Sequence, residues 1–359
     1  MKHDFLCRQN HAVRVCEWNY FLSSLPQPTD TPVPKLNDQF LKPFLSDFRK
    51  LATKFGSIPQ IASIETCWSQ RLQILFGFYK SFLRSTELPA ELSISAAGNP
   101  IRKTLGTASR RRGTKVFVFH HGECPGIERY PNAHRNDGAF PDFFVCPTEQ
   151  IRKNFEKNYS ESKIEKRSGV EYISFESTHF EGMRRKYRIA ALSGSQNTVM
   201  LIGFGMNHHR YLDGAGYFYY FQLDIQYRLC LLIKRLGYKL IYKVHPDRAS
   251  EVGSLFSSVA DVVESRPFEK CWNNCSSYVF SHPGSTVFGH ACFTKKPIVL
   301  VDLENNNWNE PGYSLLKRRC HTVRARFNSI NRILFDEAEF EEKLNNPLLL
   351  NDDYINSYC

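Results

Sequence analysis

Apolar residues recur at helical spacing near the start of the chain and gather into short runs further along. Residues 39–55 and 61–84 have apolar positions every three to four residues, which predicts two helices. From residue 92 onward, short runs rich in β-branched and aromatic side chains predict buried strands. The predicted strands are residues 92–96, 115–119, 142–146, 170–175, 198–202, 239–242, 261–263, 276–280 and 296–302. Helical patterns separate many of these strands, so the chain is expected to form parallel βαβ units.

The order of these elements predicts an α/β protein built from two successive units. A Ser-Gly-Ser-Gln run at residues 193–196 is the expected boundary between them. From Trp308 to about Asn356 the chain is predicted to be largely helical. The expected divisions are residues 1–90 (an arm and helices belonging to the first domain), 91–195 (a Rossmann-like domain), 196–335 (a second one) and 336–359 (a helical tail).

Composition places the chain among ordinary globular proteins, with 42% hydrophobic and 23% charged residues in 359. It has no apolar run of about 18 residues and no apolar signal-peptide core at its start, so a cytoplasmic location is expected. The eleven cysteines are scattered without a repeated Cys-x-x-Cys, which indicates reduced thiols. Cys271 and Cys275 lie near two histidines, but their spacing is not that of a metal site, and no metal is predicted.

The net charge of +11 implies an acidic partner. The basic residues form short groups, such as 110–112, 184–186 and 317–319, and match no nucleic-acid-binding module. An anionic membrane surface or a phosphorylated substrate accounts for the charge at least as well. We therefore expect no nucleic-acid partner, while many single lysines and arginines need be no more than solvated helix faces.

Two polar clusters follow predicted strands in the second half of the chain. Lys243 and His245 alternate at the end of the strand 239–242 and offer a positive charge and an imidazole. Ser281, Ser285 and Thr286 follow the strand 276–280 at the start of a helical pattern, where free backbone N–H groups favour an anion. Taken singly, the clusters could be a strand end and a helix cap. Together, at the strand ends of one α/β sheet, they predict a phosphate-binding crevice.

Glycines follow the strand 198–202 in the loop that contains Gly203 and Gly205. The pattern lacks the third glycine and the acidic partner of the dinucleotide fingerprint, so no NAD site and no cofactor are predicted.

The first half of the chain supplies candidates for a general base. His121 and Glu123 follow the strand 115–119, and a loop of about 20 residues containing Asp137 leads to the strand 142–146. An imidazole or a carboxylate can take the proton of an attacking hydroxyl, and Glu123 could orient His121. Two plainer interpretations stay open: His121 as a strand-end residue bound to loop backbone, and Asp137 as part of an Asn-Asp-Gly turn.

The two strand-end clusters, followed by the strand 296–302, resemble the C-terminal half of GT-B glycosyltransferases. The His-Pro motif at His245 and the later Ser/Thr motif are more similar to bacterial capsule and lipopolysaccharide transferases: the polysialyltransferase, Kdo-transferase and CDP-glycerol glycerophosphotransferase relatives. The resemblance covers roughly residues 90–305. It implies a GT-B-like fold, in which two Rossmann-like domains face each other across a cleft, with an N-terminal helical extension here. It also implies that the last helix returns to the first domain and that Glu264 lies where such enzymes contact the base or ribose.

The resemblance further implies the chemistry. In the CDP-glycerol branch the base maps onto His121, whereas the polysialyltransferase branch uses an acidic pair before a glycine, where this chain has only Asp137. The implied activity is metal-independent transfer from a nucleotide-activated sugar, favouring a CMP-linked ulosonic acid such as Kdo or sialic acid, to a surface-polysaccharide or lipopolysaccharide acceptor. The acceptor would be a glycan or a lipid-linked one, met by a protein peripheral at the inner face of the membrane. The alternatives are a CDP-alditol glycerol- or ribitol-phosphate transferase and a non-catalytic basic adaptor for membranes or nucleic acid.

Overall fold

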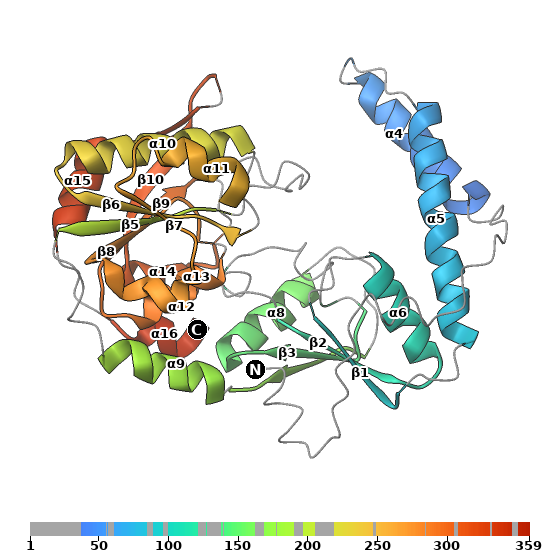
Figure 1. Ribbon diagram of the computed structural model, residues 1–359. Helices are drawn as coiled ribbons and strands as arrows, with labels where there is room; N and C mark the ends of the chain where they lie inside the picture. The colour runs from blue at the N-terminus through green and yellow to red at the C-terminus, as the bar shows by residue number, and fades with distance from the viewer. Residues whose placement is uncertain are drawn as a thin grey trace.

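The protein consists of a helical hairpin and two α/β units, seen in a computed structural model (Figure 1). The structure describes residues 37–54, 56, 61–84, 89–95, 100–120, 127, 138, 140–161, 169–176, 178–189, 197–204, 219–246, 249–283, 285–304, 308–330, 332–346 and 351–359. The boundary expected at residues 193–196 lies outside these ranges.

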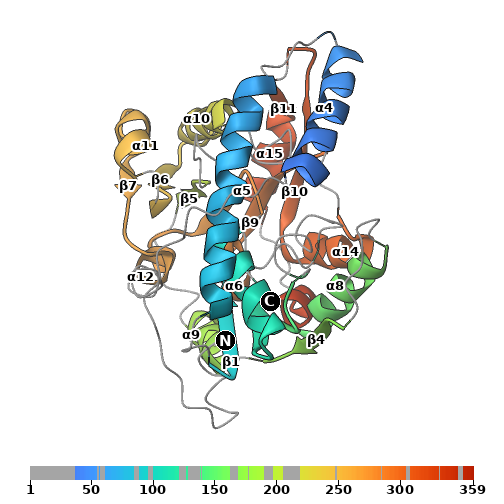
Figure 2. The same cartoon turned by 90° about the vertical axis from the view of Figure 1, so that its right-hand side faces the viewer.

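The hairpin confirms the two helices predicted near the start of the chain. A π-helical turn η1 (Asn37–Leu41) leads into α4 (Lys42–Lys54), which packs on the long helix α5 (Ile61–Arg84). Leu41 and Leu45 meet Ile61 in a small apolar core between the helices. The lower part of α5 packs on α6 (Pro100–Arg111), while the rest of the hairpin projects beyond the first unit (Figures 1 and 2).

The first unit is a four-stranded parallel sheet whose strands lie in sequence order. The strands are β1 (Glu91–Ser95), β2 (Lys115–Phe119), β3 (Phe143–Cys146) and β4 (Glu171–Ser174). The helices α6, α8 (Glu149–Glu161) and α9 (Thr178–Ile189) follow β1, β3 and β4. Because all four strands run the same way, their carboxyl ends share one edge.

The second unit is a seven-stranded sheet in the order β11-β10-β9-β8-β5-β6-β7, in which only β11 is antiparallel. Its strands are β5 (Thr198–Ile202), β6 (Lys239–Lys243), β7 (Val262–Glu264), β8 (Ser277–Phe280), β9 (Ile298–Leu303), β10 (His321–Phe327) and β11 (Ile333–Phe335). Its helices are α10 (Tyr219–Arg235), α11 (Ala249–Phe256), α12 (Phe268–Cys271) with the turn η6 (Trp272–Asn274), α13 (Thr286–Phe293), α14 (Glu310–Arg319) and α15 (Glu337–Asn345). The chain builds outward from β5 to β7 and then returns to build β8 to β10 on the other side.

The prediction of a largely helical region after Trp308 is wrong for β10 and β11. Val323 and Ala325 are buried in β10, while Arg324 and Arg326 between them are exposed. This alternation is the mark of a strand with one face on the core. Helices do form on either side, at α14 and α15 and at α16 (Asp353–Tyr358).

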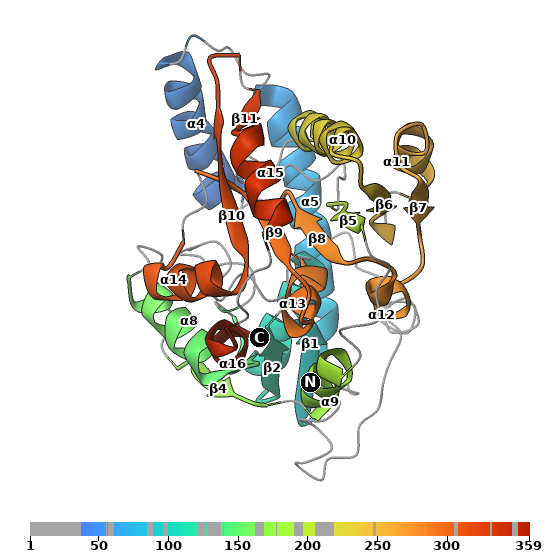
Figure 3. The same ribbon diagram turned by 90° about the vertical axis from the view of Figure 1, so that its left-hand side faces the viewer.

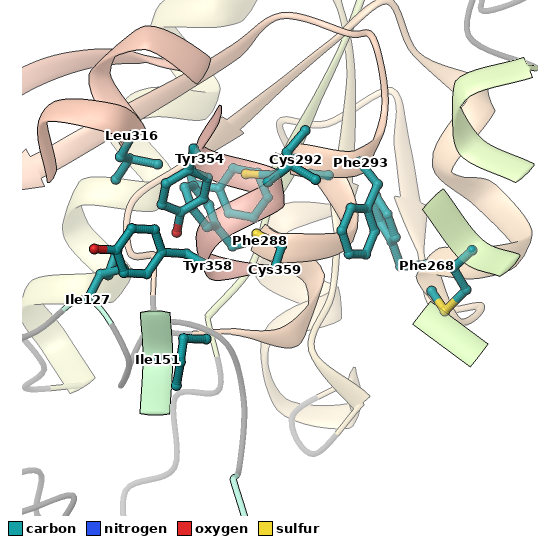
Figure 4. Packing of buried hydrophobic residues seen from close by; sticks show 14 of the residues in the cluster. Ile127, Ile151, Phe268, Phe288, Cys292, Phe293, Leu316, Tyr354, Tyr358 and Cys359 are labelled. Carbon is teal, nitrogen blue, oxygen red and sulfur yellow. The ribbon is translucent and has the colours of Figure 1, made fainter. Parts of the chain in front are cut away.

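The last helix, α16, returns to the first unit and packs on α8 as well as on α13 and α14 (Figure 3). Thr148, just before α8, donates its hydroxyl to the carbonyl of Ser357 at 2.6 Å. Tyr354 and Tyr358 are buried in an apolar cluster that also takes residues from both sheets and their helices (Figure 4). One continuous core thus joins the two units, and the α/β arrangement of two successive parallel-sheet units expected from the sequence, with its returning helix, is observed.

The cysteines within the described ranges are free thiols, and all of them except Cys67 are buried. Of the helices described, none has both the length and the apolar character needed to cross a bilayer.

Candidate functional site

The order of strands reverses between β5 and β8, which places their carboxyl ends side by side at a topological switch point. In open α/β sheets this is the position where ligands bind. Gly203 leaves β5, His245 lies just past β6 and Ser281 follows β8 directly. Three of the clusters identified in the sequence therefore follow the ends of three adjacent strands.

Gly203 holds the ends of β5 and β6 tightly together. Its N–H donates to the carbonyl of Lys243 at 2.8 Å. A Cβ at this position would lie 2.7 Å from the hydroxyl oxygen of Tyr242 and 2.9 Å from the carbonyl oxygen of Lys243. A side chain does not fit there, so the close approach of the two strands requires glycine. The second glycine of this loop, Gly205, lies outside the described residues.

A buried hydrogen-bond chain connects β6 to β8 through α10. The hydroxyl of Tyr242 donates to Gln226 Oε1 at 2.7 Å, and Gln226 Nε2 donates to Ser281 Oγ at 3.1 Å. Ser281 Oγ then donates to Gln222 Oε1 at 3.2 Å. The hydroxyl of Ser281 is therefore engaged inside the protein and fixes the start of the loop after β8. Sequence reasoning missed both glutamines, although two polar residues four apart on a buried helix face are a usable signal.

Aromatic packing joins the loops after β5 and β8. The ring of Phe204 meets the ring of His282 edge to face, with centroids 4.5 Å apart. Burial lowers the pKa of His282 to about 3, so its imidazole is neutral at physiological pH. His282 thus packs as a ring against Phe204 and brings no charge to the site.

Ser285 and Thr286 start α13. Ser285 has extended backbone angles and its Oγ accepts from the N–H of Phe288 at 3.2 Å, which is the geometry of an N-cap. The plainer interpretation of Ser285 as a helix cap therefore describes what it does in the structure. Thr286 is exposed at the first turn, where a helix offers unpaired N–H groups and the positive end of its dipole.

Lys243 and His245 differ in their surroundings. Lys243 is buried, its Nζ donates to the carbonyl of Val244 at 2.7 Å, and burial lowers its pKa. It braces the segment that carries His245 instead of presenting a charge to solvent. His245 itself is half-buried just past the end of β6.

Glu264, at the end of β7, is buried and bound by Arg266. Its Oε1 accepts from the backbone N–H of Arg266 at 2.8 Å and from the guanidinium Nε at 3.0 Å. These hydrogen bonds hold the pKa of Glu264 below its usual value. The Arg266 side chain is exposed, so it places a cation at the same sheet edge. Sequence reasoning did not single out Arg266.

The end of β2, after which the sequence predicts the candidate bases, is described as far as His120. His120 lies just past the end of β2. Its backbone N–H donates to the carbonyl of Val145 at 2.9 Å, and its ring packs edge-on against Phe155. The residues predicted for catalysis, His121, Glu123 and Asp137, lie outside the described residues. Their assignment stays a prediction.

No protein-family model and no curated protein matches this chain. Among solved structures, it is similar to UDP-N-acetylglucosamine 2-epimerase from Rickettsia bellii (14% identity, TM-score 0.40, 67% of this chain and 63% of that one, under two thirds of its length). It is also similar to UDP-GlcNAc 2-epimerase from Neisseria meningitidis bound to UDP-GlcNAc (13% identity, TM-score 0.43, 80% of this chain and 76% of that one). A third similar structure is Os79 from O. sativa in complex with UDP (10% identity, TM-score 0.45, 80% of this chain and 77% of that one). At TM-scores below 0.5 we base no conclusion about function on these similarities.

Proposed function

We propose that the protein is a glycosyltransferase of the GT-B type that binds a nucleotide-activated sugar at the carboxyl ends of β5, β6 and β8. The observation that carries the proposal is the convergence of Gly203, His245 and the start of α13 at the switch point of the second sheet. A phosphate there would meet the N-terminus of α13 and the imidazole of His245.

Within this proposal the residues have different tasks. His245, Ser285 and Thr286 contact the phosphate, and Glu264 with Arg266 faces the base or ribose from the end of β7. Lys243, Ser281 and the glycines position the backbone around the ligand. The place of the Glu264–Arg266 pair at the end of β7, the strand next to β6, supports this assignment.

The nucleotide proposal is tested by replacing His245. His245→Ala is expected to weaken nucleotide binding by about 1 to 3 kcal/mol, the usual loss for a hydrogen bond to a charged group. His321→Ala is the matched control, because His321 begins β10 and so lies at the opposite, amino-end edge of the same parallel strands. If both variants bind nucleotide as the parent does, the site has been assigned to the wrong strands.

The favoured donor is a CMP-linked ulosonic acid such as Kdo or sialic acid, and the acceptor a surface polysaccharide or lipopolysaccharide. Support comes from the His-Pro and Ser/Thr motifs of the sequence, which follow β6 and β8, the two strands that flank β5 in the sheet. Thermal-shift measurements with CMP, CDP, UDP and GDP distinguish the donors, since a bound nucleotide raises the melting temperature. A CDP-alditol transferase should respond to CDP-linked alditols. A non-catalytic adaptor should respond to no nucleotide.

The base is proposed to come from the first unit, with His121 favoured over Asp137 and Glu123 orienting the imidazole. Loss of a true general base should lower turnover by about 10²- to 10⁴-fold and leave nucleotide affinity nearly unchanged. His121→Ala and Asp137→Asn are the paired variants. A severe loss in Asp137→Asn alone would assign the base to the carboxylate, as in the polysialyltransferase branch.

A lipid-linked or glycan acceptor would be met at the inner face of a membrane, and the chain's charge of +11 supports a peripheral association with anionic lipid. Transfer is proposed to need no metal, so a chelator should leave turnover unchanged.

A further inference from the structure

An exposed apolar stripe runs along η1 and α4. Phe40, Phe44, Phe48 and Leu51 are spaced by three or four residues, so they lie on one side of the helix. They are between 37% and 64% exposed, although a large apolar side chain gains by leaving water. The rings of Phe44 and Phe48 are 6.4 Å apart. The stripe is a continuous surface rather than a set of isolated side chains.

The stripe extends onto the second helix of the hairpin. The ring of Trp68 on α5 lies 6.0 Å from the ring of Phe44, and Trp68 is also exposed. We call these five residues the aromatic stripe. They do not serve the hairpin's own core, which is made by Leu41, Leu45 and Ile61 on the adjoining side. The hairpin therefore presents an apolar surface beyond what its own fold uses.

The charged side chains of the hairpin are mainly positive. Residues 37–84 contain seven basic side chains against three acidic ones. Two of the acidic groups are already paired within α4 and its first turn, Asp38 with Lys42 at 2.7 Å and Asp47 with Lys50 at 3.1 Å. Arg49 remains as an additional cation on the same helix.

We propose that the aromatic stripe of the α4–α5 hairpin is the surface by which this protein docks on an anionic lipid bilayer. Exposed aromatic rings beside lysine and arginine suit the boundary between headgroups and acyl chains, where rings enter and cations stay at the phosphates. This names the element behind the membrane association proposed above, and it does not depend on the nucleotide site.

Charge favours lipid over a second copy of the chain as the occupant. Two hairpins meeting stripe to stripe would bring like charges together, within a chain of net charge +11. An anionic headgroup layer attracts the same charges, and each basic residue near the surface contributes about 1 kcal/mol to binding. The hairpin also projects from the first unit, with α6 as its main packing partner among the described elements (Figures 1 and 2), and the side chains of the stripe are exposed.

The test is flotation of the full chain with phosphatidylcholine vesicles that contain or lack phosphatidylglycerol. The parent should bind the anionic vesicles at low salt and much less at high salt. The double variant Phe44→Ser/Phe48→Ser should bind them about tenfold or more weakly, because two rings no longer enter the bilayer. Ile330→Ser, which changes a 77% exposed apolar residue on the β10–β11 turn, is the matched control and should bind as the parent does.

Quenching of tryptophan fluorescence by brominated lipids is a second measurement, and it does not require a variant that has lost binding. Brominated lipids should quench the fluorescence of the parent more than that of Trp68→Phe. The proposal is overturned if the parent does not bind anionic vesicles, if the double variant binds equally well, or if sedimentation shows a dimer that the double variant dissociates. Nucleotide thermal shifts of the double variant should equal those of the parent, so failure here and failure of the nucleotide site are separate results.

Discussion

Replacing Gly203 by alanine tests the packing on which the candidate site is built. The added methyl would lie 2.7 Å from the hydroxyl oxygen of Tyr242 and 2.9 Å from the carbonyl oxygen of Lys243. The carbonyl belongs to the backbone and accepts the N–H of Gly203 itself, so it cannot withdraw without loosening β5 from β6. The tyrosine can withdraw only by giving up its hydrogen bond to Gln226.

The expected cost follows from these two contacts. Overpacking of a core position costs about 1 to 3 kcal/mol, and a lost hydrogen bond adds about 0.5 to 1.5 kcal/mol. We therefore expect Gly203→Ala to lower the free energy of unfolding by about 1.5 to 4.5 kcal/mol, the sum of these ranges. Because Gln226 also holds Ser281, the shift should reach the loop after β8 and reduce the thermal shift given by nucleotides.

Urea unfolding followed by circular dichroism measures this cost. Gly253→Ala is the control, since a Cβ at Gly253 in α11 meets nothing within 4 Å. Alanine is the better helix former, so this variant should be as stable as the parent or more stable by up to about 1 kcal/mol. An unfolding midpoint of Gly203→Ala equal to that of the parent would refute the tight junction between β5 and β6.

Two further predictions concern stability. Thr148→Val removes the hydrogen bond to the carbonyl of Ser357 and a cap contact to α8, so it should lower the free energy of unfolding in urea by about 1 to 3 kcal/mol. Thr107→Val, on an exposed helix face, is the control and should change this free energy by less than about 0.5 kcal/mol. The pKa of Asp261 is held low by the N–H of Leu240 and by Lys234. The contribution of Asp261 to the free energy of unfolding is therefore complete above its unfolded-state pKa of about 3.9, and it is lost as the pH falls through the lower folded-state pKa. The stability difference between Asp261→Asn and the parent should therefore be largest at neutral pH and shrink below about pH 4, and a constant difference across this range would contradict the assignment.

Much of the secondary structure could be predicted from local pattern. The runs that became β2, β5 and β8 are short, apolar and bounded by polar residues, and both hairpin helices have their apolar residues at helical spacing. The signal for β10 was also present, as the alternation of Val323 and Ala325 with two arginines, and it was overlooked among the helices around it. These features depend on residues that are close together in the chain, which is why they can be predicted from the sequence alone.

The candidate site was also predicted in part from the sequence, and the rest of it only the structure shows. The sequence pointed to Lys243, His245 and Ser285 because polar residues after apolar runs mark strand ends. It did not reveal that Lys243 is buried against the carbonyl of Val244, and it left open whether Ser285 caps α13, as its Oγ does in the structure. Burial and partner choice depend on what other elements bring to the same place, which a local pattern does not contain.

Only the tertiary structure decided which strands meet. The order β8-β5-β6 puts Gly203, His245 and Ser281 at adjacent strand ends, although Gly203 and Ser281 lie far apart in the chain. The hydrogen-bond chain through Gln226 forms because α10, which carries this residue, packs on β5 and β6. Strand order is set by the summed packing of helices and sheet faces over the whole unit, whereas each strand and helix by itself reflects the residues within a few positions of it.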